Sequence, residues 1–258
     1  MTSLTLHPNA KINLGLLIKG KRPDGYHLLE TVLYPLPQLR DEMTLSLSDT
    51  PGCELVVSGA DLGGDPADNL CVRAWRLLRD RFPDMPGIRI ELHKSIPAGA
   101  GLGGGSSDAA FTLTGLNTLL RLGLPDSELA ALGSRLGADV PFFVYNRPLL
   151  ATGIGTEFEE IALPPLGHIE LITPPIHSAT AAAYRALDYR TCDPARDLRT
   201  ILAHPVTAWS DHLVNDLERP VFSLYPQLAE IKADLYARGA VYAAMSGSGS
   251  AVFGVFGE

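Results

Sequence analysis

Residues 94–110, KSIPAGAGLGGGSSDAA, constrain the fold more than any other stretch of the chain. Five glycines lie within residues 99–105, so few side chains keep a ligand away from the backbone. Successive N–H groups of such a loop can form a concave nest for phosphate oxygens. The stretch therefore predicts an anion site, most simply one for phosphate.

A helix is expected to start where this loop ends. Ser106 or Ser107 is the expected N-cap, and Gly123 with Pro125 is the expected stop. Its unpaired N-terminal N–H groups and positive dipole end would then face the ligand in the loop. The apolar positions that define the helix are Ala109, Ala110, Leu113, Leu116, Leu119 and Leu120.

Other glycine-rich loops fit less well. Gly99, Gly101 and Gly104 formally match the dinucleotide-binding fingerprint, with 88–92 as the preceding strand. That motif needs a second strand ending in an acidic residue about 20 positions on, whereas a second helical stretch follows here. A Walker loop is excluded because the sequence contains no Gly-Lys-Ser or Gly-Lys-Thr. A flexible surface loop is disfavoured because the loop leads directly into a helix.

Size and charge limit the classes of function. The 258 residues are 46% hydrophobic, enough for one large or two small domains. The net charge of −8 gives no general attraction for nucleic acid or anionic lipid, so an anionic ligand must be held locally.

Cysteine usage and the N-terminus bear on the compartment. Cys53, Cys71 and Cys192 are odd in number and lack Cys-x-x-Cys spacing, which predicts neither a disulfide framework nor a zinc knuckle. The first residues do not resemble a signal peptide, and no apolar run approaches a membrane span. We expect a soluble protein of the cytoplasm.

Hydrophobic patterning predicts a mixture of strands and helices. The expected strands are 12–18, 26–34, 42–47, 54–58, 88–92, 151 onward, 169–173, 240–245 and 251–256; the expected helices are 68–82, 107–122, 126–137, 179–187, 210–218 and 226–236. Val140 precedes Pro141 and is expected to be extended, which would place Asp139 at a helix-to-strand junction. Taken alone, Asp139 would be interpreted as a turn or cap residue.

Three stretches resemble the motifs of the GHMP small-molecule kinases: AKINLGL with GKRPDGYH at 10–27, the loop at 97–110, and MSGSGS at 245–250. KINL followed by KR-x-DGYH is similar, more narrowly, to the diphosphocytidyl-methylerythritol kinases, as is GADVPFF at 137–143. The resemblance implies an α+β fold of two domains, with ATP and substrate in the cleft between them. It also implies an ATP-binding and catalytic domain at 1–148 and a substrate-binding domain at 149–258.

The implied activity is ATP-dependent phosphorylation of a hydroxyl of diphosphocytidyl-methylerythritol, in the non-mevalonate route to isoprenoids. Asp139 matches the proposed general base of the family, and Lys11 matches its charge partner. Phosphoryl transfer needs such groups, namely a carboxylate near the hydroxyl and positive charge near the transferred group. The resemblance implies ATP together with Mg²⁺, and no protein ligand for a metal is expected. The residues expected to bind ATP are Pro97, Ala98, Gly99, Ala100, Gly101, Leu102, Gly103, Gly104, Gly105, Ser106 and Ser107.

The small-molecule partner implied is a cytidine diphosphate compound. Tyr26 and His27 match residues that stack on and hydrogen-bond cytosine, and Tyr184 matches a second aromatic residue on the base. Asn13, Thr180, Gly247 and Ser248 are further expected substrate contacts. No nucleic-acid or membrane partner is expected, and the oligomeric state is expected to be a monomer or weak homodimer.

The sequence departs from the family pattern at Asn9, where proline is common, and at 145–149. Two other classes of function stay open. Another GHMP kinase, such as a mevalonate or homoserine kinase, should lack the Asp-Gly-Tyr-His segment. A silent nucleotide-binding protein would lose Lys11 or Asp139, and both residues are present.

Overall fold

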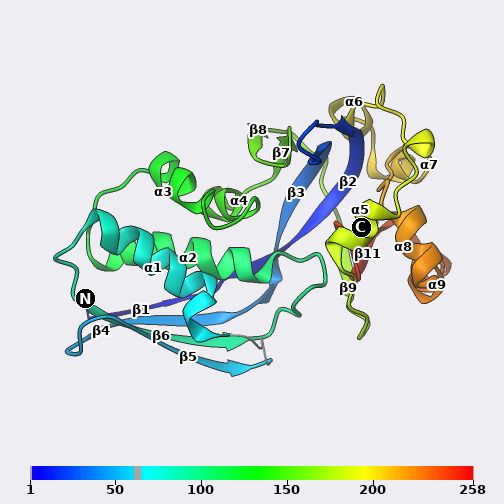
Figure 1. Ribbon diagram of the computed structural model, residues 1–258. Coiled ribbons are helices and arrows are strands. Elements are labelled where there is room, and N and C mark those ends of the chain that lie inside the picture. The colour runs from blue at the N-terminus through cyan, green and yellow to red at the C-terminus, as the bar shows by residue number, and fades with distance from the viewer. Residues whose placement is uncertain (1, 61–64, 258) are drawn as a thin grey trace. The chain divides into compact units, whose positions relative to one another are not determined.

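The computed structural model describes residues 2–60 and 65–257, which form an α+β structure with three sheets among these residues (Figure 1). The residues gather into two compact units. The first comprises Met1–Lys11, Pro35–Ala98 and Gly103–Arg147; the second comprises Ile12–Tyr34, Gly99–Leu102 and Pro148–Glu258. These segments interleave along the chain, so no single cut separates the units. The assignment of ATP binding to 1–148 and substrate binding to 149–258 stays a prediction.

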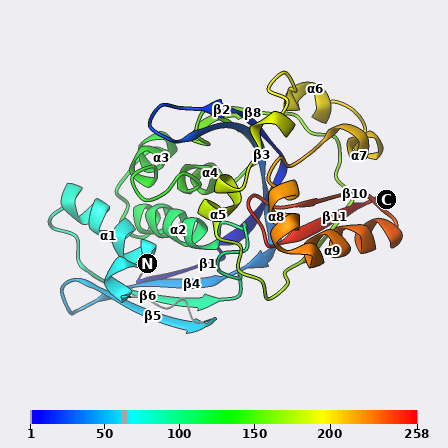
Figure 2. The same ribbon diagram turned by 45° about the vertical axis from the view of Figure 1, so that its right-hand side comes forward.

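A four-stranded sheet with helices on one face forms the first unit (Figures 1 and 2). Its strands, in spatial order, are β1 (Ser3–Leu6), β4 (Glu42–Ser48), β6 (Gly87–Lys94) and β5 (Cys53–Gly59). Only the β5–β6 pair is parallel among these pairings. The helices on this face are α1 (Leu70–Arg81) and α2 (Gly104–Leu119), while α3 (Asp126–Gly133) and α4 (Val140–Tyr145) pack against α2; the 3₁₀ turn η1 (Pro66–Asp68) precedes α1.

Helix α2 lies close to the sheet because glycine stands at its point of contact. A Cβ atom on Gly115 would lie 2.4 Å from Leu6 Cδ1 and 2.6 Å from Leu45 Cδ1. Leu113 and Leu116, on the same helix, are fully buried. The helix is therefore held by apolar packing on several sides, and its N-terminus is fixed relative to the strands.

Two sheets form the second unit. One contains β2 (Asn9–Lys21), β3 (His27–Arg40), β7 (Leu149–Thr152) and β8 (Glu157–Glu160) in that order, although the ends of β2 and β3 belong to the first unit. The other is the antiparallel sheet β10 (Ala240–Met245), β11 (Val252–Phe256) and β9 (His168–Ile172). The remaining elements are α5 (Thr180–Arg185), η2 (Tyr189–Thr191), α6 (Leu198–Leu202), η3 (Val206–Ala208), α7 (Trp209–His212), α8 (Glu218–Leu224) and α9 (Pro226–Ala237).

Helix α9 packs against β10 and β11, and its buried leucines, Leu228 and Leu235, share an apolar core with Ala243, Met245 and Val252 of these strands. Three aromatic side chains are also buried in this unit. Trp209, Tyr242 and Phe253 are fully buried, and Tyr242 meets each of the other two rings edge-on. Edge-to-face contacts of this kind add to the burial of apolar area. The C-terminal strands are thus held independently of the first unit's core.

The expected N-cap at Ser106 or Ser107 is wrong, because α2 begins at Gly104. Its N-cap is Gly103, in the left-handed conformation with φ of 72°, and no side chain caps the helix. Glycine adopts this conformation without the steric cost that a Cβ atom imposes, so the chain enters the helix earlier than the serines suggested. Both serines consequently lie in the first turn.

The expected strand after Asp139 is also wrong. Residues 140–145 form α4, with Pro141 in its first turn, where a missing N–H removes no helical hydrogen bond. Asp139 therefore stands at the N-cap position of a helix.

The single helix expected at 210–218 is instead divided between α7 and α8, and β1, β8 and α6 were not anticipated. All three cysteines are free thiols. In the part of the chain that the structure describes, no helix combines the length and apolarity that a membrane crossing requires.

Truncating a buried leucine of α2 should destabilise the fold. We expect Leu113→Ala to lower the free energy of unfolding by about 2–5 kcal/mol, because it removes buried methyl groups and leaves a cavity. Leu47→Ala is the control in the same unit, since Leu47 is 42% exposed, and it should cost less than about 1 kcal/mol. Urea denaturation measures both; equal losses would contradict the packing described for α2.

Candidate active site

An ion pair stands at the start of α4, within the first unit. Lys11 Nζ lies 3.5 Å from Asp139 Oδ2, and the two side chains are 6% and 34% exposed. Asp139 occupies the N-cap position of α4, yet its side chain makes no cap hydrogen bond. Its carboxylate is therefore not used to hold the helix and remains accessible to a ligand.

The N-terminus of α2 lies beside this pair. A Cβ atom on Gly103 would be 3.2 Å from Lys11 Cγ and 2.8 Å from the Phe143 ring. A Cβ atom on Gly137 would be 3.7 Å from Ser106 Oγ, so the segment that carries Asp139 meets the first turn of α2. The structure therefore brings Lys11, Asp139 and the predicted phosphate-binding helix start together in one unit.

At three positions of the loop, the backbone adopts a conformation that requires glycine. Gly99, Gly101 and Gly103 have φ values of 67°, 76° and 72°, a region that side chains rarely adopt. In the second unit, a Cβ atom on Gly101 would lie 2.2 Å from the Ser246 carbonyl oxygen, and one on Gly99 would lie 2.5 Å from the His177 ring. At Gly99 and Gly101, the backbone thus packs so closely against other residues of the unit that a side chain could not fit.

The other loop residues differ in what they offer a ligand. Ala100 and Leu102 are buried, so their side chains anchor the loop and only their backbone can meet a phosphate. Ser107 Oγ, in the first turn of α2, is buried with no hydrogen-bond partner among the described residues. An unpaired buried hydroxyl costs free energy, which fits a site that a polar ligand completes.

The turn between β10 and β11 meets residues 100–101 within the second unit. Ser246 Oγ donates to the Gly101 carbonyl oxygen at 2.9 Å, and the Ala251 N–H donates to the Ala100 carbonyl oxygen at 3.1 Å. The Asn13 N–H donates to Ser246 Oγ at 3.3 Å. These contacts connect the turn to both the loop and β2.

Most of the remaining predicted substrate residues also gather at this turn. The hydroxyls of Thr180 and Ser248 are 2.8 Å apart. Asn215, which sequence reasoning missed, donates from Nδ2 to the carbonyl oxygens of Met245 and Gly247, both at 2.8 Å. Asn215 lies 30 residues before the turn, and no local pattern marks it.

A cavity of about 430 Å³ opens at the start of β3 in the second unit. It is lined by Asp24, Gly25, Tyr26, His27, Leu29, Ile154 and Tyr184. The centroid of the His27 ring lies 4.5 Å from that of Tyr184, and Tyr26 is 61% exposed. The structure thus brings the three predicted base-binding residues together at one cavity.

Comparison with known proteins identifies the family. The model of the GHMP kinases N terminal domain matches residues 69–147, and that of the GHMP kinases C terminal matches 201–258. A protein of Porphyromonas gingivalis named 4-diphosphocytidyl-2-C-methyl-D-erythritol kinase is 47% identical over 260 residues, covering 99% of this chain and 93% of that protein. This chain belongs to the 4-diphosphocytidyl-2-C-methyl-D-erythritol kinase family of GHMP kinases.

Solved structures agree with the membership of this kinase family. A crystal structure of 4-(cytidine 5'-diphospho)-2C-methyl-D-erythritol kinase matches with a TM-score of 0.86 and 36% identity, covering 98% of this chain and 90% of that one. A homoserine kinase from Cytophaga hutchinsonii matches with a TM-score of 0.73 at 19% identity, covering 98% and 85%, and shares the fold. The resemblance and fold class predicted from the motifs are confirmed, while the individual site residues stay predictions.

A further aromatic residue of this family member contacts His27, a residue of the cavity lining, and was missed from the sequence. The Tyr189 ring stacks on that of His27, with centroids 5.7 Å apart and planes 7° from parallel. His27 Nε2 is buried and has no hydrogen-bond partner among the described residues. The signal that could have identified Tyr189 is its place five residues after Tyr184, on the same segment.

The imidazole of His27 should titrate below its ordinary range. Burial lowers the pKa of His27, and the nearby Lys21 ammonium lowers it further, because both disfavour the charged ring. The stability that the neutral ring contributes is present above the unfolded value of about 6.5 and is lost as pH falls through the folded pKa.

Titration of the His27 ring by NMR measures this shift, and the midpoint should lie below 6.5. Lys21→Gln should raise the midpoint because it removes the neighbouring charge, while burial keeps it below that of an exposed histidine. A midpoint at or above the ordinary value would contradict the described surroundings of the ring.

Proposed function

We propose that this chain transfers the γ-phosphoryl group of ATP to a hydroxyl of 4-diphosphocytidyl-2-C-methyl-D-erythritol, a step of the non-mevalonate route to isoprenoid precursors. The observation that carries the proposal is the Lys11–Asp139 pair beside the start of α2, in a chain that belongs to this kinase family. The name of the family indicates the substrate, and the geometry of the Lys11–Asp139 pair supports phosphoryl transfer as the chemistry.

Asp139 serves as the general base. Its carboxylate is one-third exposed and uncommitted to the helix cap, so it can accept the proton of a substrate hydroxyl. The buried ammonium of Lys11, 3.5 Å away, keeps the carboxylate charge compensated and adds positive charge where phosphoryl charge develops. Positioning and electrostatics of this kind account for most of the catalysis of phosphoryl transfer.

Nucleotide phosphates fit the loop at 97–107. Glycine at positions 99, 101 and 103 places no side chain between the N–H groups and a ligand, and Ser107 Oγ offers a buried hydroxyl that has no partner among the described residues. When bound there, ATP supplies the phosphoryl group. The helix N-terminus adds a partial positive charge that favours phosphate.

Magnesium is proposed to come with the nucleotide. In the described parts of the chain, no three or more His, Cys, Asp or Glu side chains form a group that could hold a metal ion. Mg²⁺ usually keeps several waters and is held largely by substrate phosphates, so no protein cage is needed.

The cytidine end of the substrate is proposed to bind in the cavity of Tyr26, His27 and Tyr184. The aromatic rings offer faces for stacking, and an imidazole offers a donor and an acceptor to a base edge. Asn13, Thr180, Gly247 and Ser248 are proposed to contact the rest of the substrate. We further propose that the kinase acts in the cytoplasm on small molecules alone, as a monomer or weak homodimer.

A panel of acceptors tests the proposed function. ATP consumption should require 4-diphosphocytidyl-2-C-methyl-D-erythritol and should be absent with mevalonate or homoserine, because only the first carries a base for the aromatic cavity. The assay follows ADP release under identical conditions with each acceptor. Activity with mevalonate or homoserine alone would overturn the substrate assignment and leave the phosphoryl-transfer chemistry intact.

Replacing the proposed base should separate chemistry from folding. We expect Asp139→Asn to lower turnover by about 10²–10⁴-fold, because the amide keeps the shape but cannot accept the proton. The melting temperature should fall only through loss of the ion pair with Lys11, since asparagine is as good an N-cap as aspartate and Asp139 makes no cap bond. ATP affinity should be unchanged or tighter, because a negative charge near the phosphates is lost.

Asp126→Asn is the matched control, since it removes the same charge from an exposed position in the first turn of α3. Its turnover should equal that of the unmodified protein. Near-normal turnover of Asp139→Asn, measured per folded molecule, would exclude Asp139 as the base.

A further inference from the structure

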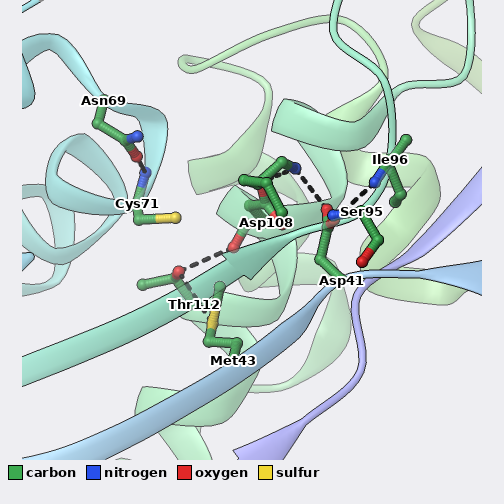
Figure 3. A network of polar contacts seen from close by, with 9 residues as sticks. Asp41, Met43, Asn69, Cys71, Ser95, Ile96, Asp108 and Thr112 are labelled. Atoms are coloured by element: carbon green, nitrogen blue, oxygen red, sulfur yellow. Dashed lines mark hydrogen bonds and ion pairs between the residues drawn. The ribbon is translucent and has the colours of Figure 1, made fainter. Parts of the chain in front are cut away.

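A buried network of two aspartates and one lysine lies within the first unit, and Figure 3 labels the two aspartates, Asp41 and Asp108. Lys94, the last residue of β6, bonds Asp108 Oδ2 through Nζ at 2.6 Å and also bonds Asp41 Oδ2. Asp41 stands between β3 and β4, and Asp108 belongs to α2. All three residues are at most 4% exposed.

A buried network of charged side chains contributes little to the stability of the fold. Three charges are taken out of water, and their attraction offsets that cost only when geometry and additional hydrogen bonds are good. Buried charged groups are better explained by a role in fixing one conformation than by a gain in stability, and that role has to be shown for each protein. The question is therefore which conformation the network fixes.

The network fixes the first residues of the loop. Asp41 Oδ1 accepts the Ser95 N–H at 2.6 Å and the Ile96 N–H at 2.8 Å (Figure 3). Hydrogen bonds to a carboxylate are stronger than neutral ones, and these two orient consecutive peptide groups. Ile96 is itself buried, so the chain leaves β6 in a single direction.

The same network fixes the far end of the loop. Lys94 precedes the glycine stretch and Asp108 follows it, so their bond joins the two ends of residues 95–107. Lys94 Nζ lies 3.4 Å from where a Cβ atom on Gly104 would stand, and Ile96 Cγ2 lies 2.9 Å from that point. The first residue of α2 thus rests on the lysine and on the start of the loop.

Asp41 is the stronger of the two carboxylate anchors. Burial raises the pKa of Asp108 to about 7, although the Lys94 ammonium opposes the rise, and Asp108 Oδ1 has no partner among the described residues. Other titratable and polar groups around it are Asp41, Cys71 from α1, and Thr112 from α2 itself. Asp41, by contrast, accepts from three donors across both of its oxygens.

We propose that Asp41 is a positioning residue for nucleotide binding, which holds both ends of the phosphate loop through Lys94 and the backbone of Ser95 and Ile96. The inference rests on the proposed function in that ATP is the ligand. Glycine-rich segments lose the most conformational freedom when ordered, so an unanchored loop would have to be ordered by the nucleotide itself, and affinity would fall.

The test compares Asp41→Ala with Asp41→Asn and with a control variant on α2, the helix that follows the loop. Asp41→Ala removes both acceptor oxygens that Asp41 contributes to the network, whereas Asp41→Asn keeps an oxygen for the Ser95 and Ile96 N–H groups. Asn117→Ala is the control, because Asn117 near the end of α2 exchanges two hydrogen bonds with the Leu124 backbone, at 2.9 and 3.0 Å. It removes a comparable backbone anchor far along the helix from the loop.

Three measurements are made on each variant: ATP affinity by titration calorimetry, the KM values for ATP and for the cytidine substrate, and hydrogen exchange of the 95–103 amides. Asp41→Ala should weaken ATP binding by about 10–100-fold, the usual consequence of misplaced binding groups, and should accelerate exchange in the loop. The KM for the cytidine substrate should hardly change. Asp41→Asn should recover much of the loss, and Asn117→Ala should lower thermal stability alone.

Unchanged ATP affinity and loop exchange in folded Asp41→Ala would overturn the proposal, as would an equal loss of ATP affinity in Asn117→Ala. If Asp41→Ala does not fold, Asp41→Asn decides, because it removes the carboxylate charge that faces Lys94 and should still weaken ATP binding and speed loop exchange, although by less than Asp41→Ala. If the unmodified protein binds no ATP, the proposed function fails, while the exchange comparison still decides whether Asp41 orders the loop.

Discussion

The first unit depends on how charges are balanced at the start of α2. Two lysines approach it, since Lys11 Cγ lies near Gly103 and Lys94 Nζ lies near Gly104. Cations are disfavoured at the positive end of a helix, so this arrangement is unstable unless negative charge accompanies it. Carboxylates pair with both lysines, namely Asp139 with Lys11 and Asp41 with Lys94. With the lysines paired, the partial positive charge of the helix N-terminus is what an anionic ligand would meet.

The two ion pairs differ in burial, and burial separates their roles. Asp139 is one-third exposed and 3.5 Å from its lysine, so its carboxylate can exchange protons and meet a substrate. Asp41 and Lys94 are inaccessible and closely bonded, so their geometry is fixed. A base that must accept a proton needs the first kind of environment, and a loop that must keep one conformation needs the second. Within one unit, we therefore propose that one pair of these residue types serves chemistry and the other serves architecture.

Local patterns in the sequence predicted most of the elements. Hydrophobic patterning identified β2, β6 and β11, and the glycine stretch located the loop and the helix after it. The start of α2 was missed because its cap is the left-handed Gly103 rather than a serine, and α4 was missed because Val140 was expected to be extended before Pro141, which instead lies in the first turn of the helix. Asp41 and Asn215 could not be identified, since their partners lie 53 and 30 residues away and only the folded chain brings them together.

The aromatic rings around His27, at the cavity lined by Tyr26, His27 and Tyr184, can serve two purposes. The rings of Tyr184 and Tyr189 beside His27 remove its imidazole from water, and this burial lowers the pKa of His27. A neutral imidazole carries one donor and one acceptor, whereas the charged ring carries donors alone. The edge of a pyrimidine such as cytosine presents both hydrogen-bond donors and acceptors. Only a neutral imidazole can pair with either of these groups. The apolar surfaces suited to stacking on a base thus also keep the histidine in the form that can hydrogen-bond its edge.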